Sequence, residues 1–143
     1  MKIFLFCALI VATEAALGGL LGRTQSSGAK GILTCNKRPA AGVLVKLYDD
    51  DRGIDTDDLM ATTKTDSRGY FELEGYTSEI TTIDPKINIY HDCNDELKPC
   101  QRKITIYVPD KYVSSGKKAK AIYDAGTIEL GGKFKGESRD CIH

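Results

Sequence analysis

Short runs in which apolar and polar residues alternate fill most of the chain after residue 30. In the run 43–48, aliphatic residues alternate with Lys46 and Tyr48, which is the period of a β-strand that buries one face. Turn residues separate the runs, and in Asp66-Ser67-Arg68-Gly69 the glycine is expected to take a positive φ. The runs are 30–35, 43–48, 60–65, 70–76, 86–91, 104–108 and 125–130. About seven short strands without connecting helices predict an all-β fold, a two-sheet β-sandwich.

The N-terminal residues have the layout of a secretory signal peptide. Lys2 is followed by an apolar run, 3–12, that is too short to span a bilayer. The small side chains of Thr13 and Ala15 suit cleavage before Ala16. We therefore expect a signal peptide at 1–15, a flexible leader at 16–27 and one β-sandwich domain at 28–143. The protein is expected to be secreted and extracellular.

Removal of the signal peptide would leave four cysteines, Cys35, Cys93, Cys100 and Cys141. An even number of cysteines in an exported chain predicts two disulfides, and four cysteines allow three pairings. Because a short loop closes easily, the interval between Cys93 and Cys100 favours a bond between these two, which pairs Cys35 with Cys141. The sequence alone leaves the three pairings open.

An ordered series of short motifs connects the chain to a known family. The motifs include Thr34-Cys35, Val45-Lys46-Leu47-Tyr48-Asp49, Thr65-Asp66-x-x-Gly69-x-Phe71, Thr82-Ile83-Asp84-Pro85-Lys86, Ile89-Tyr90-His91-Asp92-Cys93, Cys100-Gln101-Arg102-Lys103, Val108-Pro109-Asp110 and Arg139-Asp140-Cys141. From about Lys30 onward the chain resembles the nematode transthyretin-like family of secreted proteins. The resemblance implies a transthyretin-type (prealbumin-type) β-sandwich and an exported protein that is not an enzyme and needs no cofactor.

Better-understood relatives differ from this chain at their functional sites. The relatives that hydrolyse hydroxyisourate end in a Tyr-Arg-Gly-Ser-type tetrapeptide, whereas this sequence ends Asp140-Cys141-Ile142-His143. Only His91 and His143 could serve as histidine bases, and His91 alternates with aliphatic residues, so it is expected to be buried. Neither hydrolysis nor the hormone transport of the tetrameric carriers is therefore carried over to this chain.

Two groups of residues in the sequence include possible metal ligands. His91, Cys93, Cys141 and His143 include zinc-binding residue types, but their spacing matches no usual zinc module and oxidising export favours disulfides. The acidic run 49–58 offers carboxylates for calcium but lacks the glycine and the glutamate of an EF-hand loop. We expect this run to be a solvated, turn-capping loop, with calcium binding left open.

Two groups of side chains are candidates for surface contact. Lys111, Lys117, Lys118 and Lys120 form a basic cluster that suits anionic lipid head groups or an acidic partner. Tyr48, Tyr90 and Tyr107 fall opposite the aliphatic rows of their strands and would form an exposed aromatic stripe if those strands are neighbours.

With 20 basic and 20 acidic residues the formal net charge is zero, so we expect no overall electrostatic attraction to nucleic acid. No segment after the expected signal peptide predicts a membrane span. We expect a secreted, non-enzymatic binding protein whose ligand is a small apolar molecule, a lipid or a protein. The alternative is an extracellular bridging or host-directed factor that contacts membrane lipid or a receptor through its surface.

Overall fold

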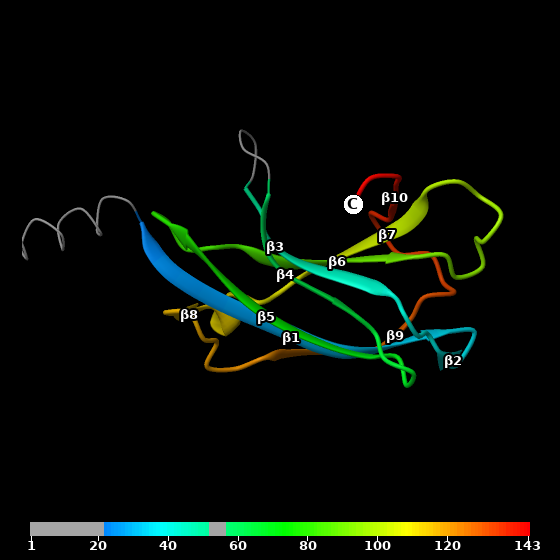
Figure 1. The fold of residues 1–143 in the computed structure, drawn as a ribbon, viewed down its shortest axis with the longest axis horizontal. Helices are drawn as coiled ribbons and strands as arrows, with labels where there is room; N and C mark the ends of the chain where they lie inside the picture. The colour runs from blue at the N-terminus through cyan, green and yellow to red at the C-terminus, as the bar shows by residue number, and fades with distance from the viewer. Residues whose placement is uncertain (1–21, 52–56) are drawn as a thin grey trace, which may run out of the picture.

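The computed structural model describes residues 22–51 and 57–143 as a sandwich of two β-sheets (Figure 1). The first sheet contains β1 (Arg23–Cys35), β2 (Arg38–Pro39), β5 (Tyr70–Glu79), β8 (Ser114–Ser115) and β9 (Tyr123–Glu129). The second contains β3 (Leu44–Asp49), β4 (Asp58–Lys64), β6 (Pro85–His91), β7 (Gln101–Tyr107) and β10 (Ser138–Asp140), in the order β10-β7-β6-β3-β4. All pairs are antiparallel except β1 with β9, and a 3₁₀ turn, η1 (Asp110–Tyr112), precedes β8.

The expected all-β sandwich is confirmed. The seven expected runs coincide with β1, β3, β4, β5, β6, β7 and β9, although four of the runs extend one residue beyond the strand. The three additional strands, β2, β8 and β10, are only two or three residues long. They are too short to show an alternating pattern.

The expected flexible leader at 16–27 is wrong for its last five residues, 23–27, which belong to the domain. Strand β1 begins at Arg23, and its first part pairs with β5 from the register Arg23↔Glu79 onward. Gln25, Ser26 and Ser27 are buried. Residues 1–21, which include the expected signal peptide, lie outside the described part of the chain. Within the part that is described, no helix is long and apolar enough to cross a membrane.

Apolar side chains from both sheets fill the space between the sheets. In β3 and β6 the inward-facing residues Val45, Leu47, Ile87 and Ile89 have no exposed surface. A fully buried aliphatic side chain contributes roughly 1.5–3 kcal/mol relative to an exposed one, so this interior accounts for much of the stability. The buried cluster consists of Ala29, Leu33, Val45, Leu47, Phe71, Leu73, Ile87, Ile89, Cys93, Ile104, Val108, Ile128 and Leu130.

The turn between β4 and β5 has the geometry that its sequence predicts. Gly69 has φ 78°, and its N–H donates to the carbonyl of Asp66 at 3.0 Å. The Asp66 carboxylate accepts the N–H groups of Arg68 and Tyr70. A Cβ on Gly69 would overlap the carbonyl oxygen of Leu33, so glycine is required both for its φ and for the close approach to β1.

Both disulfides form, but the pairing expected from loop length is wrong. Cys35 at the end of β1 bonds Cys93 after β6, and Cys100 bonds Cys141 after β10. The first bond joins the two sheets, and the second ties the C-terminal segment to the start of β7. The sandwich brings these strand ends together, and ease of loop closure does not override that arrangement.

Candidate functional site

Three tyrosines share the outer face of the second sheet. The strand register places Tyr48 of β3 and Tyr107 of β7 on either side of Lys86 in β6, and Tyr90 lies further along β6. Tyr107 is 49% exposed and Tyr48 is half-buried, but Tyr90 is only 3% exposed. The tyrosines therefore lie on one face, as expected, whereas the expectation of one exposed stripe is wrong at Tyr90.

Ion pairs and hydrogen bonds fix one end of this face. The ammonium group of Lys86 lies 2.6 Å from Asp57 Oδ2 and 3.5 Å from Asp50 Oδ1. The hydroxyl of Tyr107 donates to Asp50 Oδ2 at 2.8 Å. The charge of Lys86 is therefore matched by carboxylates and does not give this end of the face a free cation.

A chain of side-chain hydrogen bonds crosses the middle of the same face. Thr105 Oγ1 donates to Asn88 Oδ1 at 2.7 Å, and Asn88 Nδ2 donates to the hydroxyl of Tyr90 at 3.3 Å. Burial raises the pKa of Tyr90 to about 12, so its hydroxyl stays neutral at physiological pH. The position of the Tyr90 ring is therefore set by β6 and its neighbours.

The segment that follows β10 covers Tyr90. The imidazole of His143 stacks on the Tyr90 ring with 4.1 Å between centroids and 15° between planes. His143 Nε2 lies 2.7 Å from Gln101 Oε1. An open groove of about 320 Å³ adjoins this stack. The groove is lined by Tyr48, Asp57, Asn88, Tyr90, Lys103, Asp140, Ile142 and His143.

The basic residues lie on the opposite sheet. The segment between β8 and β9 folds over the outer face of the first sheet (Figure 1), where Ala119 N–H donates to Glu74 of β5 at 2.6 Å. Gly28 of β1 permits this arrangement, because a Cβ there would come within 2.6 Å of the Ile122 side chain. Lys117 lies 5.5 Å from the ring centroid of Tyr76, which is 51% exposed.

All four lysines of the expected cluster are exposed. Lys117, Lys118 and Lys120 share the segment between β8 and β9, whereas Lys111 lies on η1, 5.5 Å from the Tyr112 ring centroid. None of the four forms an ion pair with a carboxylate of the described residues. We use "basic segment" below for Lys117, Lys118 and Lys120.

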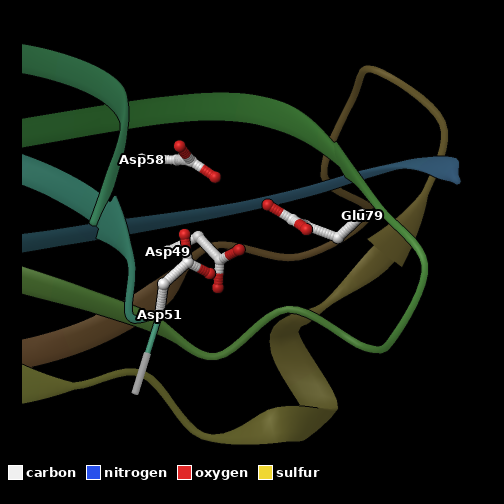
Figure 2. A group of neighbouring side chains, drawn as sticks. All are labelled: Asp49, Asp51, Asp58 and Glu79. Carbon is white, nitrogen blue, oxygen red and sulfur yellow. The ribbon is translucent and has the colours of Figure 1, made fainter. Parts of the chain in front are cut away.

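Four carboxylates converge where the end of β3 and the start of β4 meet the end of β5. Asp49, Asp51 and Asp58 meet Glu79 of β5 (Figure 2), and each offers an oxygen within 4.8 Å of the others. A hydrogen bond with Asp58, burial and the neighbouring carboxylates raise the pKa of Glu79 to about 7. Burial is also the main cause that raises the pKa of Asp49. The cluster therefore retains protons at pH values where isolated carboxyl groups are ionised.

The carboxylates at the described ends of the acidic run accept backbone N–H groups. Asp49 Oδ1 accepts the N–H of Asp84 at 2.9 Å, and Asp57 Oδ1 accepts the N–H of Asp51 at 3.1 Å. Residues 52–56 lie outside the described part of the chain. Asp57 therefore caps the described ends of the run, whereas the expectation of a solvated loop is wrong at Asp49, which is buried and bonds the segment before β6. Calcium binding stays untested.

His91 belongs to the interior, as its alternation with aliphatic residues predicts. It is 3% exposed, and its Nδ1 accepts the N–H of Cys93 at 3.1 Å. Burial, followed by the nearby charge of Arg102, lowers the pKa of His91. Cys93 and Cys141 are both in disulfides, as expected for an exported chain, and offer no thiolate to zinc.

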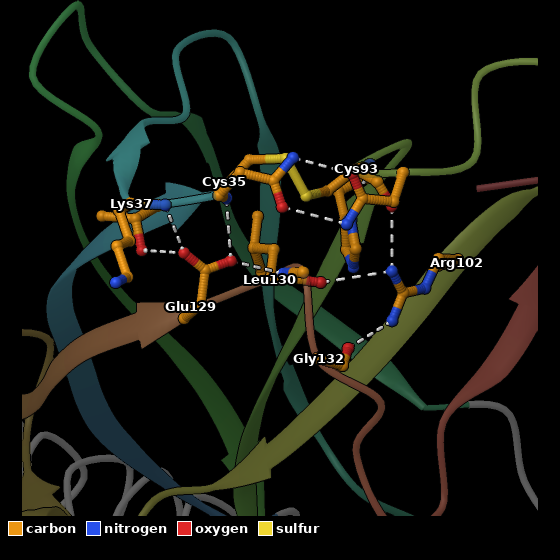
Figure 3. The surroundings of a disulfide bond; sticks show 12 residues. Cys35, Lys37, Cys93, Arg102, Glu129, Leu130 and Gly132 are labelled. Carbon is orange, nitrogen blue, oxygen red and sulfur yellow. Dashed lines mark hydrogen bonds between the residues drawn. A yellow bond between two sulfur atoms is a disulfide. The ribbon is translucent and has the colours of Figure 1, made fainter.

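Arg102 is an important residue that the sequence interpretation did not single out. It is 8% exposed, and its guanidinium donates to the carbonyls of Cys93, Leu130 and Gly132 (Figure 3). It also forms an ion pair with Glu137. The available signal was its place on β7, where it shares the inward face with Ile104 and Ile106.

Glu129 organises the turn beside the first disulfide (Figure 3). Its carboxylate accepts N–H groups from Lys37 at 2.7 Å, Asn36 at 3.0 Å and Gly131 at 2.6 Å. These hydrogen bonds, led by the one from Lys37, lower the pKa of Glu129 to about 2. Asn36 and Lys37 both have positive φ, so Glu129 compensates for an unfavourable backbone conformation.

The two-sheet sandwich, its packed interior and its two disulfides define a transthyretin-type domain. The chain belongs to the transthyretin-like family, whose model matches residues 30–109. Transthyretin-like protein 5 of Caenorhabditis elegans is 58% identical over 143 residues and is covered completely, as is this chain. Transthyretin-like protein 33 of the same nematode is 52% identical, with 99% of this chain and 94% of the relative covered.

Transthyretin-like protein 2 of Caenorhabditis elegans is 48% identical, with 94% of each chain covered. Among solved structures, a 9R-lipoxygenase from Cyanothece matches 74% of this chain and 16% of its own chain, with a TM-score of 0.44 and 20% identity. A likeness this weak carries no argument about fold or function.

Proposed function

We propose that this transthyretin-like protein is a secreted, non-enzymatic binding protein that contacts an anionic surface through its basic segment. The observation that carries the proposal is the exposure of Lys117, Lys118 and Lys120 beside an exposed aromatic ring, Tyr76, with no carboxylate partner in the described residues. Ammonium groups next to an aromatic side chain suit the interface between anionic head groups and apolar lipid.

The packed interior favours surface contact over the carrier reading. A carrier of small apolar molecules needs an enclosed apolar cavity. The inward residues of β3 and β6 have no exposed surface, because they pack closely between the two sheets. Binding through an outer face is therefore the form of recognition that this sandwich supports best.

Two disulfides in the described domain support the secretory part of the proposal. Disulfides persist in oxidising compartments and are rare in the cytosol. Expression of the full chain in a secretory cell should release a protein that starts at Ala16, and mass spectrometry of the medium tests this. Retention of an uncleaved chain inside the cell would contradict export.

Vesicle co-sedimentation tests the binding proposal directly. The full chain should bind vesicles that contain an acidic phospholipid and should not bind purely zwitterionic ones. At about 1 kcal/mol per lysine near an anionic surface, the triple variant Lys117→Ala/Lys118→Ala/Lys120→Ala should lose roughly 100-fold in affinity at low salt. Binding should also weaken as salt is raised, because exposed charges are screened.

A charge-matched variant provides the control. Lys98, Lys133 and Lys135 are exposed lysines outside the basic segment, and their triple alanine variant has the same net charge. It should keep most of the affinity. Equal losses in the two variants would show that only net charge matters and would contradict a role for the basic segment. Failure of the unmodified protein to bind the acidic vesicles would overturn the proposal.

A further inference from the structure

Tyr90 lies on the outer face of β6, a central strand of the second sheet, on the same face as the half-buried Lys86 and the buried Asn88. Tyr90 is only 3% exposed, and the side chain that stacks on its ring is that of His143, from the segment after β10. The ring is held from below by β6 and by the hydrogen bond from Asn88 to its hydroxyl. The sheet thus positions the Tyr90 ring, called the Tyr90 platform below, whereas His143, which covers this ring, belongs to another segment.

The segment that carries His143 is strongly anchored only as far as Cys141. Strand β10 pairs with β7 through Ser138–Asp140, and Arg139 forms two hydrogen bonds with Asp95, at 2.6 and 2.7 Å. Cys141 is bonded to Cys100. Beyond this bond, Ile142 is 90% exposed, and its N–H donates to Asp140 Oδ1 of the same segment at 2.9 Å. His143 is therefore held by its own contacts with Tyr90, Gln101 and Asp140.

Those contacts are individually weak enough to be exchanged. A stacked aromatic pair contributes about 0.5–1.5 kcal/mol beyond its buried area, and a single hydrogen bond contributes a similar net amount. The separation between His143 Nδ1 and Asp140 Oδ1 is 3.7 Å, which is longer than a hydrogen bond. Displacing His143 from Tyr90 leaves the disulfide, the Arg139 ion pair and the β10 pairing intact.

Gln101 sets the hydrogen-bonding requirement of the position above Tyr90. Its Nε2 donates to Asp92 Oδ2 at 2.8 Å, so its Oε1 is the atom that faces the imidazole. A carbonyl oxygen accepts, and the ring atom opposite it must therefore be an N–H. The position thus combines a flat aromatic surface with one acceptor at the edge of the bound ring.

We propose that the Tyr90 platform is a binding site for a small planar heteroaromatic molecule with a ring N–H, and that His143 is its internal competitor. The open groove beside the stack extends the site, since Asp57 and the ion pair of Lys103 with Asp140, at 3.7 Å, give it a polar lining for a polar substituent. The site lies on the second sheet, whereas the basic segment lies over the first. It is therefore independent of vesicle binding.

The test compares His143→Ala with the unmodified protein, using imidazole and indole as probes. Titrations followed by 1H–15N NMR should show that both probes shift the signals of Tyr90 and Gln101 in the variant. The unmodified protein should bind at least tenfold more weakly, because His143 competes intramolecularly. 1-Methylimidazole has no ring N–H and should bind the variant several-fold more weakly than imidazole.

Ser138→Ala is the matched control, because it alters an exposed side chain of the same segment outside the groove lining and keeps His143. It should behave as the unmodified protein does. Equal affinities for His143→Ala and the unmodified protein, or shifts that map away from Tyr90, would overturn the proposal. A measurement that needs no variant is also available: high indole concentrations should move the His143 ring signals of the unmodified protein toward those of a free histidine peptide, and unchanged signals would contradict displacement.

Discussion

The guanidinium of Arg102 and the carboxylate of Glu137 form a two-hydrogen-bond ion pair, with Nη2–Oε1 at 2.7 Å and Nε–Oε2 at 2.9 Å. Both side chains are 9% exposed. The remaining guanidinium N–H groups reach carbonyls beside the first disulfide and after β9, so one side chain joins β6, β7, β9 and the segment before β10. Hydrogen bonds from Arg102 hold the pKa of Glu137 below its usual value.

Breaking this pair should be costly because each partner would leave the other buried and unmatched. We expect Glu137→Ala and Arg102→Ala each to lower the free energy of unfolding by about 3–5 kcal/mol, measured by urea denaturation. The double variant should lose less than the sum of the two, because it leaves no buried unpaired charge. The exposed pair of Arg68 and Asp66, at 3.8 Å, is the control, and Arg68→Ala should cost less than about 0.5 kcal/mol. Additive losses at Arg102 and Glu137 would contradict this account.

Glu129 should give the fold an acid-sensitive component. Its pKa is about 2 in the folded protein against an ordinary value of 4.5, so its contribution is present above pH 4.5 and is lost as pH falls toward 2. Glu129→Gln should therefore lower the melting temperature at pH 7, with a difference from the unmodified protein that shrinks steadily below pH 4.5. The exposed Glu96 serves as control, and Glu96→Gln should leave the melting temperature unchanged across this range. A difference that persists at the lowest accessible pH would argue against the charge of Glu129.

The acidic cluster should have the opposite pH dependence. Glu79 has a raised pKa of about 7, so the folded protein binds more protons there than the unfolded chain, and stability falls as pH rises from about 4.5 through 7. Glu79→Gln removes the repulsion from the neighbouring aspartates. It should raise the free energy of unfolding by about 1 kcal/mol at pH 8 and by much less at pH 5, after allowance for solvent screening. Chemical denaturation at the two pH values measures this, and a destabilising effect at pH 8 would refute it.

The sequence predicts those parts of the fold that follow from a local pattern. Period-two alternation is strong in runs such as 43–48 and 86–91, because one face of each strand packs against the core while the other faces outward. The first half of β1 has no such pattern. Small residues are needed there, since Gly28 leaves room for Ile122 from a segment far along the chain, and a contact of that kind has no local signal.

The candidate sites also combine features that a local sequence pattern predicts with features that depend on long-range contacts. The positions of Tyr48, Tyr90 and Tyr107 on one face follow from alternation, but the burial of Tyr90 depends on His143, which arrives through the second disulfide and β10. Glu79 joins the acidic cluster from β5, although it lies outside the acidic run. Long-range contacts decide these features, and a strand pattern carries no information about them.

The disulfide pairing gives the most direct test of the topology. Non-reducing proteolysis with mass spectrometry should find peptides that join Cys35 to Cys93 and Cys100 to Cys141. Since the bonds close loops with sequence separations of 58 and 41, the chain-entropy account assigns about 4 kcal/mol to each. The paired variants Cys35→Ala/Cys93→Ala and Cys100→Ala/Cys141→Ala should therefore lose similar stability in urea. A peptide that joins Cys93 to Cys100 would contradict the structure, because Cys35 could then no longer bond Cys93 across the two sheets.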